Sequence, residues 1–374
     1  MKNRHSTLTA AGLTVALAGV LSGPLRAEPP GPPSDPPEDT MKSLQEIWDK
    51  LEALEAENVA LDAMLDAILG IVTIEMVAVG NAGNDADTDG DPNPAGKVDY
   101  EYKIGKYEVT NAQYAAFLNA VAATDPNGLY NPNMAGARGG ITRTGTSGSY
   151  TYAVKGFMGD KPVNYVSWYD ALRFCNWLHN GQPKGLQDGS TTEGGAYTLT
   201  SETSVQAGDH PTHGANGRNT GARNWLPSED EWYKAAYHEP GASVNGYWLY
   251  PTRSDSGPGP GGGPTVATAD LFGNIDNDTP NIANYNGGAD WNGQTGNVTT
   301  VGSGGPGSAS FYGAFDMGGN VREWNEQLLV LIPLRRGLRG GSWINLAGLL
   351  QSSFRDFDFP TFGGSNDGFR VAGP

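Results

Sequence analysis

The sequence has little cysteine, little histidine and little positive charge. Its 374 residues include one cysteine, Cys175, and five histidines. An internal disulfide framework and a four-cysteine zinc site are therefore excluded. Lys and Arg number 24 against 41 Asp and Glu, so the formal net charge is −17 at pH 7. A chain this acidic is a poor partner for nucleic acid or for an anionic membrane surface.

The sequence is instead rich in glycine and in aromatic residues. It has 54 glycines and nine tryptophans, and 10% of its residues are aromatic. Disordered acidic tails lack aromatic residues, so we expect a folded domain with an aromatic core and many irregular loops. Residues 183–224 and 251–280 are rich in Gly, Ser, Thr, Asn and Pro and are expected to be long loops. Since disulfides cannot hold these loops, bound ions are the natural candidates.

The N-terminus has the pattern of an export signal. A basic start is followed by a short run of small apolar residues that ends near Ala27, which predicts a signal peptide over residues 1–27. An uncleaved membrane anchor is the alternative. Beyond this run no apolar stretch is long enough to span a bilayer. We therefore expect an exported protein, periplasmic or extracellular, with no membrane association after cleavage. Residues 28–40 form a proline-rich linker that should be stiff and extended.

Residues 41–70 carry a heptad pattern that predicts a coiled coil. The seam positions alternate at spacings of three and four over four heptads. They are Leu44, Ile47, Leu51, Leu54, Asn58, Leu61, Leu65 and Ile68. Asn58 favours a parallel dimer, whereas Leu at the a positions with Ile at some d positions favours trimers or tetramers. We predict a homo-oligomer formed through residues 44–68; the alternative is a single amphipathic helix packed on the globular domain.

Three helices of the globular part have clear N-terminal signals. Thr110 is placed as an N-cap, Ser167 is followed three residues later by Asp170, and Ser228 and Glu231 have capping-box spacing. The helices that follow carry residues expected in the core. They are Cys175, Trp177, Trp232 and Tyr233.

Three patterns with reactive side chains have plain structural alternatives. Cys175 lies in an apolar helix, which favours a buried residue over a nucleophile. The H-P-T-H motif at residues 210–213 is a transition-metal site or, as we prefer, a solvated loop. Residues 85–90 read D-x-D-x-D-G, but Gly96 occupies the position where an EF-hand needs glutamate. This segment is a weak calcium loop or, more simply, a solvated turn.

The stretch FDMGGNVREW at residues 315–324 is a stronger candidate for a cation site. Asp316, Asn320 and Glu323 offer hard oxygens, and two glycines allow a tight turn that directs backbone carbonyls inward. Calcium takes six to eight such oxygens. The alternative is a turn capped by Asp316.

The order of motifs resembles the formylglycine-generating enzyme, or sulfatase-modifying factor, family. The motifs are KIGKYEVTNAQYAAFLN, PVNYVSWYDALRFCNWL, NWLPSEDEWYKAA, IANYNG, YGAFDMGGNVREW, LRGGSW and DGFRVA, in this order between residues 74 and 374. The resemblance implies one α+β domain over residues 74–374, poor in regular secondary structure and related to the C-type lectin fold. In this chain that domain would follow the coiled-coil stalk.

The resemblance also implies structural calcium at two places. The second set is Asp316, the carbonyls of Gly319 and Val321, and Glu323. The first set includes Asn284 and the carbonyl of Tyr285, with Asp290 as a candidate for a further ligand.

The family's oxidase chemistry is not expected here. Active members oxidise a cysteine in a Cys-x-Pro-x-Arg motif to formylglycine with molecular oxygen and a copper ion. Two cysteines, three and eight residues after the serine of GGS, hold the copper. Ser342 matches that serine, but the two positions are Asn345 and Leu350. Because Cu(I) prefers thiolate ligands, we do not expect copper. A second branch, which forms carbon–sulfur bonds with iron, needs a histidine-bearing helical domain that this chain lacks.

Ser342, Trp343, Asn345 and Arg355 are predicted to line a pocket for a peptide or a glycan. An aromatic face, amide groups and one charge suit such ligands. The alternative is that Arg339 and Arg355 form structural ion pairs with acids such as Asp356 and Glu323. We favour a binding or structural module, stabilised by calcium and carried on a stalk, over an enzyme. An oxidoreductase of altered metal chemistry and a true formylglycine-generating oxidase are the alternatives.

Overall fold

A computed structural model describes residues 45–50, 53, 70–199, 217–242, 245–277, 279–329 and 335–374. The chain divides into two units, Met1–Met64 and Leu65–Pro374. In the first unit residues 45–50 are helical, as the heptad pattern predicts. The predicted signal peptide, the linker, the H-P-T-H motif and every seam position of the coiled coil except Ile47 lie outside the described residues. In the described ranges no helix is long and apolar enough to cross a membrane.

The second unit has three α-helices and many short strands in its described part. The helices are α3 (Asn111–Val121), α4 (Trp168–His179) and α5 (Glu229–Tyr237). The strands are β1 (Met76–Val79), β2 (Tyr102–Gly105), β3 (Ile141–Thr144), β4 (Thr151–Val154), β5 (Thr265–Val266), β6 (Ile282–Ala283), β7 (Arg322–Leu329), β8 (Arg335–Arg339), β9 (Asp356–Asp358), β10 (Asp367–Gly368) and β11 (Ala372–Gly373). Short 3₁₀ turns are η1 (Pro132–Ala135), η2 (Pro260–Gly262), η3 (Pro306–Ser308) and η4 (Ala347–Leu350). The predicted mixed architecture with little regular structure is confirmed.

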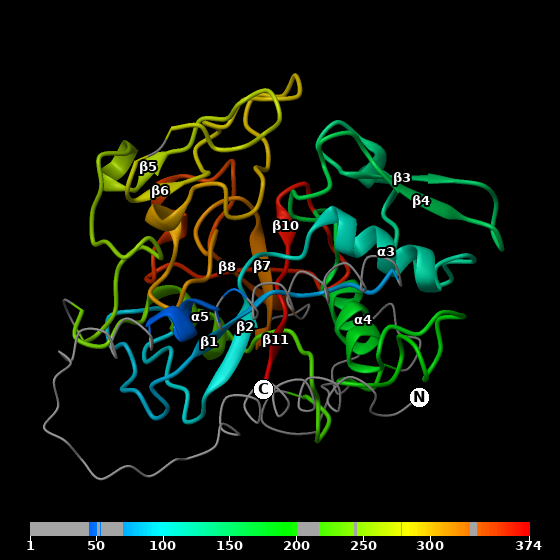
Figure 1. Cartoon of the computed structure of the whole chain (residues 1–374), viewed down its shortest axis with the longest axis horizontal. Helices are drawn as coiled ribbons and strands as arrows, with labels where there is room; N and C mark the ends of the chain where they lie inside the picture. Colours follow the sequence, from blue (N-terminus) through cyan, green and yellow to red (C-terminus); the bar gives the residue numbers. More distant parts are fainter. Residues whose placement is uncertain are drawn as a thin grey trace, which may run out of the picture. The chain divides into compact units, whose positions relative to one another are not determined.

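A four-stranded sheet of order β10-β7-β8-β9 lies in the middle of this unit. β8 runs antiparallel to both β7 and β9, and β10 runs parallel to β7. A second sheet of order β1-β2-β11 joins the last strand of the chain to the first two. Figure 1 shows α3 and α4 on one flank of the central sheet and β5 and β6 on the other.

All three predicted helix starts are confirmed, and each is a complete capping box. The side chains of Thr110, Ser167 and Ser228 each accept a bond from the backbone N–H three residues further on. The side chain at that third position bonds back to the N-cap backbone. Each capping box satisfies two N–H groups that would otherwise be unpaired. The capping residues therefore determine where each helix begins.

The core is aromatic, as the composition predicts. Trp168, Trp177, Trp232 and Trp324 are among its largest fully buried side chains. Cys175 on α4 is also fully buried, and burial raises the pKa of its thiol well above the ordinary value. The prediction that it is a packing residue and not a nucleophile agrees with this position.

Side-chain amides hold the long loop after α4. Asn176 donates to the carbonyls of Thr192 and Tyr197 and accepts from the Tyr197 N–H at 2.7 Å. Asn180, at the end of α4, donates to the carbonyls of Thr191 and Gly194. Residues 183–199 contain no helix or strand, so these bonds replace the backbone ladder that would otherwise order them. In this loop, side-chain hydrogen bonds provide the ordering contacts that we expected from bound ions.

The D-x-D-x-D-G segment is a turn docked on α5. Asp87 is buried and accepts from the Tyr233 hydroxyl at 2.6 Å and from the Asp89 N–H at 2.9 Å. Gly90 packs so closely on Tyr233 that a Cβ atom would lie 2.1 Å from its hydroxyl oxygen. The turn is therefore partly buried rather than solvated, and Asp87 serves it as a hydrogen-bond acceptor.

Candidate functional site

The glycine turn after β8 directs Ser342 into the protein. Gly340 and Gly341 have φ angles of 89° and 66°, a region that favours glycine. The buried Ser342 hydroxyl donates to Asn345 Oδ1 at 2.6 Å and accepts from Asn366 Nδ2 at 3.3 Å. Sequence reasoning predicted Ser342 and Asn345 together but missed Asn366, which a distant segment supplies. The Ser342 hydroxyl thus links the two amides in one polar cluster.

Trp343 is covered rather than open. Only 3% of its surface is exposed. The Arg138 guanidinium lies 4.5 Å from its ring centroid, and Arg138 is held there by the carbonyls of Thr295 and Gly296. A cation over an indole face is a favourable contact. The aromatic face that the sequence suggested for a ligand is thus already occupied by a side chain of the same chain.

The second cysteine position of the family is filled by an apolar side chain. Leu350 on η4 is fully buried in a small cluster of apolar residues. The others are Tyr250, Ala283, Tyr285 and Ala347. With the amide of Asn345 bonded to Ser342 and Leu350 offering no donor, the residues present do not fit a copper ion.

Arg355 is held in an ion pair with an acid of α5. It pairs with Glu229 on α5 through two bonds of 2.8 and 2.6 Å, and Arg339 shares the same carboxylate at 2.9 Å. Both arginines therefore form ion pairs, as the alternative expected, but with Glu229 as their shared acid. The acids proposed as their partners pair elsewhere: Asp356 with Arg322 and Glu323 with Arg370.

The segment of residues 316–323 is buried around an ion pair. Glu323 binds the Arg370 guanidinium through two contacts of 2.6 Å and accepts from the Trp232 indole at 2.8 Å. Asp316 accepts from the Gly302 N–H at 2.6 Å, and burial raises its pKa to about 6. A calcium ion at this place would have to share Glu323 with Arg370.

Asn284 brings the two predicted calcium segments into contact. Its carbonyl accepts from the Asn320 N–H at 2.8 Å, and its amide nitrogen donates to the Asn297 carbonyl at 2.9 Å. A Cβ atom at Gly319 would lie 2.3 Å from the Asn284 carbonyl oxygen, so only glycine fits there. The side-chain oxygen of Asn284 is buried without a partner. Such an oxygen fits a hard cation.

The neighbouring Tyr285 and Val321 are packing residues by their side chains. Tyr285 donates its hydroxyl to the Pro264 carbonyl at 2.6 Å, and its own carbonyl accepts from the Gly288 N–H at 3.2 Å. Val321 packs with Trp291 and Trp343 in a second apolar cluster. Any role of these two residues toward an ion would use their backbone carbonyls, as the resemblance implies.

Glu108 belongs to the same buried acidic group and was missed from the sequence. One of its oxygens has no partner, and the other accepts weakly from Asn320 at 3.3 Å. Burial raises its pKa well above the ordinary value, and the charges of Asp316 and Glu323 add to this. Glu108 also lines a cavity of about 550 Å³. Three acids against one arginine leave a negative excess, which a proton or a cation can balance.

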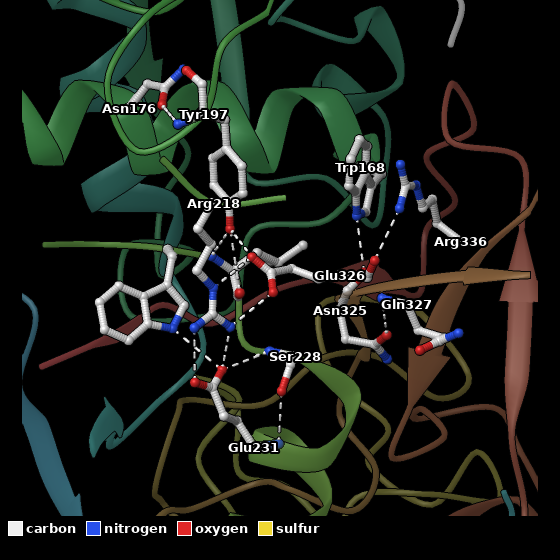
Figure 2. Close-up of polar contacts among 12 residues, drawn as sticks. Trp168, Asn176, Tyr197, Arg218, Ser228, Glu231, Asn325, Glu326, Gln327 and Arg336 are labelled. Carbon is white, nitrogen blue, oxygen red and sulfur yellow. Dashed lines mark hydrogen bonds and ion pairs between the residues drawn. The ribbon is translucent and has the colours of Figure 1, made fainter. Parts of the chain in front are cut away.

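A second buried charge network surrounds Arg218 (Figure 2). Its guanidinium bonds Glu231 at 2.9 and 2.5 Å and Glu326 at 2.7 and 2.8 Å. The Tyr197 hydroxyl donates to Glu326 at 2.5 Å, and the Arg218 guanidinium lies 4.6 Å from the Trp225 ring centroid. Burial raises the pKa of Glu326 to about 7. The network ties the segment after residue 216 to α5 and β7.

Comparison with known proteins gives a family match and one curated relative at low identity. The model of the sulfatase-modifying factor enzyme 1-like domain matches residues 71–373. Hercynine oxygenase of Mycolicibacterium smegmatis is 24% identical over 307 residues, which are 71% of this chain and 52% of the relative. The chain thus spans about half the length of that relative.

Solved structures align over most of the chain with low similarity. The crystal structure of CarF has a TM-score of 0.45 and 23% identity over 81% of this chain and 99% of that one. Variable protein 1 of Treponema denticola has a TM-score of 0.42 and 19% identity over 81% and 96% of the two chains. PvdO from Pseudomonas aeruginosa has a TM-score of 0.40 and 18% identity over 81% and 92%.

Proposed function

The chain belongs to the family of sulfatase-modifying factor enzyme 1-like domains, and on this premise we propose that it is a binding module of that family without copper-dependent cysteine oxidase activity. The Ser342 turn is the observation that carries the proposal. At the two positions where the family's copper ligands are expected, Asn345 bonds Ser342 and Leu350 is buried in an apolar cluster. Neither side chain can replace a thiolate.

The single cysteine does not offer a replacement. Cys175 lies in the aromatic core on α4, and the Ser342 turn belongs to a different packing cluster. Its thiol is uncharged at neutral pH because burial raises its pKa. A buried thiol is neither a ready nucleophile nor a ready copper ligand.

Structural calcium is part of the proposal. The unpartnered oxygen of Asn284 supports it, because it lies against the Gly319 turn that the resemblance associates with an ion. We expect calcium to raise the melting temperature of the wild type, since a ligand that binds only the folded state stabilises it. The Asn284→Ala variant should lose this response. Equal responses of both proteins in a thermal melt would remove Asn284 from the ion's ligands.

The remaining parts of the proposal rest on sequence pattern alone. They are export directed by residues 1–27 and self-association through residues 44–68. Together they describe an exported module displayed on an oligomeric stalk, with a peptide or a glycan as the ligand class first suggested by the residues around Ser342. Export is tested by fractionating cells that express the full chain and reading the N-terminus of the product.

An oxidase assay tests the central claim. The full chain is incubated with a Cys-x-Pro-x-Arg peptide, copper and oxygen, and the peptide mass is read. A family enzyme that carries both cysteines is the control. We expect no conversion while the control converts its peptide. Formation of the aldehyde by this chain would overturn the proposal and would place the chemistry at a centre other than Asn345 and Leu350.

A metal-dependent oxygenase is the second candidate, favoured by the similarity to hercynine oxygenase. Both histidines of the described ranges have structural partners: His179 accepts from the Arg223 N–H at 3.0 Å, and His238 bonds the Tyr312 hydroxyl at 2.7 Å. No group of three His, Cys, Asp or Glu side chains in those ranges is arranged to hold a metal. Stoichiometric iron in the purified chain, with oxygen uptake that depends on it, would favour this candidate.

A further inference from the structure

A cavity of about 550 Å³ lies beside the start of α3, and no residue of the Ser342 cluster lines it. This volume is in the range of small-molecule sites. Segments that are distant in the sequence meet around it, and its lining residues in the described ranges include no lysine, arginine or histidine. We call it the Glu108 cavity and define it by Glu75, Tyr107, Glu108, Asp160 and Val301.

Glu108 brings a carboxylate oxygen without a partner to this cavity. The residue is only 1% exposed. Its Oε2 accepts from Asn320 Nδ2 at 3.3 Å, whereas its Oε1 is buried and has no hydrogen-bond partner. Of the buried side-chain atoms that lack a partner in the described ranges, Glu108 Oε1 is the one whose residue lines the cavity. Because a buried acceptor without a partner is costly, a hydrogen-bond donor in the cavity would stabilise it.

The charges inside the protein leave Glu108 without a cation of its own. Asp316 and Glu323 are the acids whose charges act on it, and Arg370 is the neighbouring cation. Arg370 is already held by Glu323 through two contacts of 2.6 Å. One arginine therefore faces three carboxylates, and the negative charge of Glu108 is not balanced.

The lysines next to the lining segments are bonded elsewhere. Lys106 pairs with the exposed Glu75 at 2.6 Å. The Lys161 ammonium donates to a carbonyl and to a hydroxyl, each at 2.6 Å. Neither lysine donates to Glu108. Anions are therefore disfavoured in the cavity, and a cation that can donate a hydrogen bond is favoured.

We propose that the Glu108 cavity binds the primary ammonium group of a small organic amine. The ammonium donates to Glu108 Oε1 and supplies the missing positive charge. Ile74, Val301 and the Tyr107 ring offer apolar surface for the carbon chain of the ligand. A single free oxygen suits an ammonium, which acts as a point charge, better than a guanidinium, whose planar fork matches both oxygens of a carboxylate.

Simpler occupants leave part of the problem unsolved. Water can donate to the oxygen but leaves the buried charge. A proton removes the charge, but the carboxylic acid then keeps a buried oxygen without a hydrogen-bond partner. Calcium at residues 316–323 would use a ligand set that does not include Glu108. In the described ranges no group of three His, Cys, Asp or Glu side chains is arranged to hold a metal.

Binding of n-propylammonium to the full chain tests the inference. Calorimetry at pH 8 in saturating calcium gives the affinity for the wild type, for Glu108→Gln and for Glu101→Gln. Glutamine keeps the size of the side chain and removes its charge, while Glu101 is an exposed acid outside the cavity and controls for lost surface charge. We expect Glu108→Gln to bind at least about tenfold more weakly, as for a lost hydrogen bond to a charged group, and Glu101→Gln to bind like the wild type.

The wild type alone provides a second test that no folding defect can obscure. The neutral n-propanol keeps a donor but has no charge, and propyltrimethylammonium keeps the charge but has no N–H. Both should bind at least about tenfold more weakly than n-propylammonium. Equal binding of either compound, equal binding by Glu108→Gln, or no binding of n-propylammonium would each overturn the inference. Binding of the amine only when calcium is absent would assign the Glu108 oxygen to the calcium site and would overturn it as well.

This inference rests on the proposed binding function but fails separately from it. Loss of the amine result alone would leave the Ser342 argument against oxidase activity intact. Aldehyde formation in the oxidase assay would overturn that argument and leave amine binding at Glu108 as measured.

Discussion

Among single residues, the buried arginine Arg218 allows the clearest prediction about stability. The Arg218 guanidinium compensates two buried carboxylates, those of Glu231 and Glu326, and the side chains of these two acids are almost fully buried. A buried pair adds little net stability over apolar packing, but removing one partner leaves an uncompensated charge. Replacing Arg218 should therefore destabilise the fold mainly because it leaves two buried carboxylates without a cation.

The first prediction concerns Arg218→Met. The substitution leaves Glu231 and Glu326 facing each other without a cation, so we expect a loss of about 3–5 kcal/mol in the free energy of unfolding. Arg253→Met is the matched control, since Arg253 pairs with Glu239 at 2.8 Å while about half exposed. It should cost less than about 1 kcal/mol. Denaturant titration measures both; similar losses in the two variants would contradict the prediction.

The loss in Arg218→Met should also depend on pH with a definite sign. Glu326 has a pKa raised by burial to about 7, above its unfolded value. Its folded form therefore holds a proton that the unfolded chain releases, and stability falls as pH rises through about 7. Without Arg218 the carboxylate is harder to ionise, so this fall should continue to higher pH than in the wild type.

At the scale of elements, local patterns predicted helix starts and missed what holds the loops. Thr110, Ser167 and Ser228 were found because a capping box is complete within four residues. Asn176 was not found as a loop anchor, since its partners lie 16 and 21 residues further along an irregular segment. Asn366 and Glu108 were not predicted as site residues for the same reason. Their contacts to Ser342 and Asn320 span 24 and 212 residues, which no local spacing records.

The second prediction concerns this anchor. Asn176→Ala removes two donors and one acceptor from the loop of residues 183–199, so its backbone groups at Thr192 and Tyr197 lose buried partners. We expect the loop to exchange its amide hydrogens faster while α4 itself stays protected. The global cost should be about 1–3 kcal/mol.

Hydrogen exchange read by mass spectrometry checks this result. Asn119→Ala is a control of similar chemistry on α3, because its amide bonds β4 rather than the loop. Faster exchange of residues 183–199 in Asn119→Ala, or unchanged exchange in Asn176→Ala, would show that the loop is ordered by other contacts.

At the scale of the whole molecule, the family domain and the predicted stalk are specified by different parts of the sequence. The family match begins at residue 71, directly after the predicted coiled coil of residues 41–70. In the stalk segment the seam residues are Leu or Ile at all positions but Asn58. An isolated helix of this length gains little from propensity alone, so the apolar seam stabilises it only if another helix or the globular domain covers the seam.

The last prediction follows from that seam. Leu54→Lys places a charge at a d position and should convert the oligomer of the full chain into a monomer, because a buried lysine in the seam has no partner. Ala53→Lys adds the same charge one residue earlier, at a c position that faces away from the seam, and should leave the oligomer intact. Light scattering coupled to size-exclusion chromatography measures both masses. A monomeric wild type, or an unchanged mass for Leu54→Lys, would mean that the seam covers its own domain and that the ligand sites are not displayed in multiple copies.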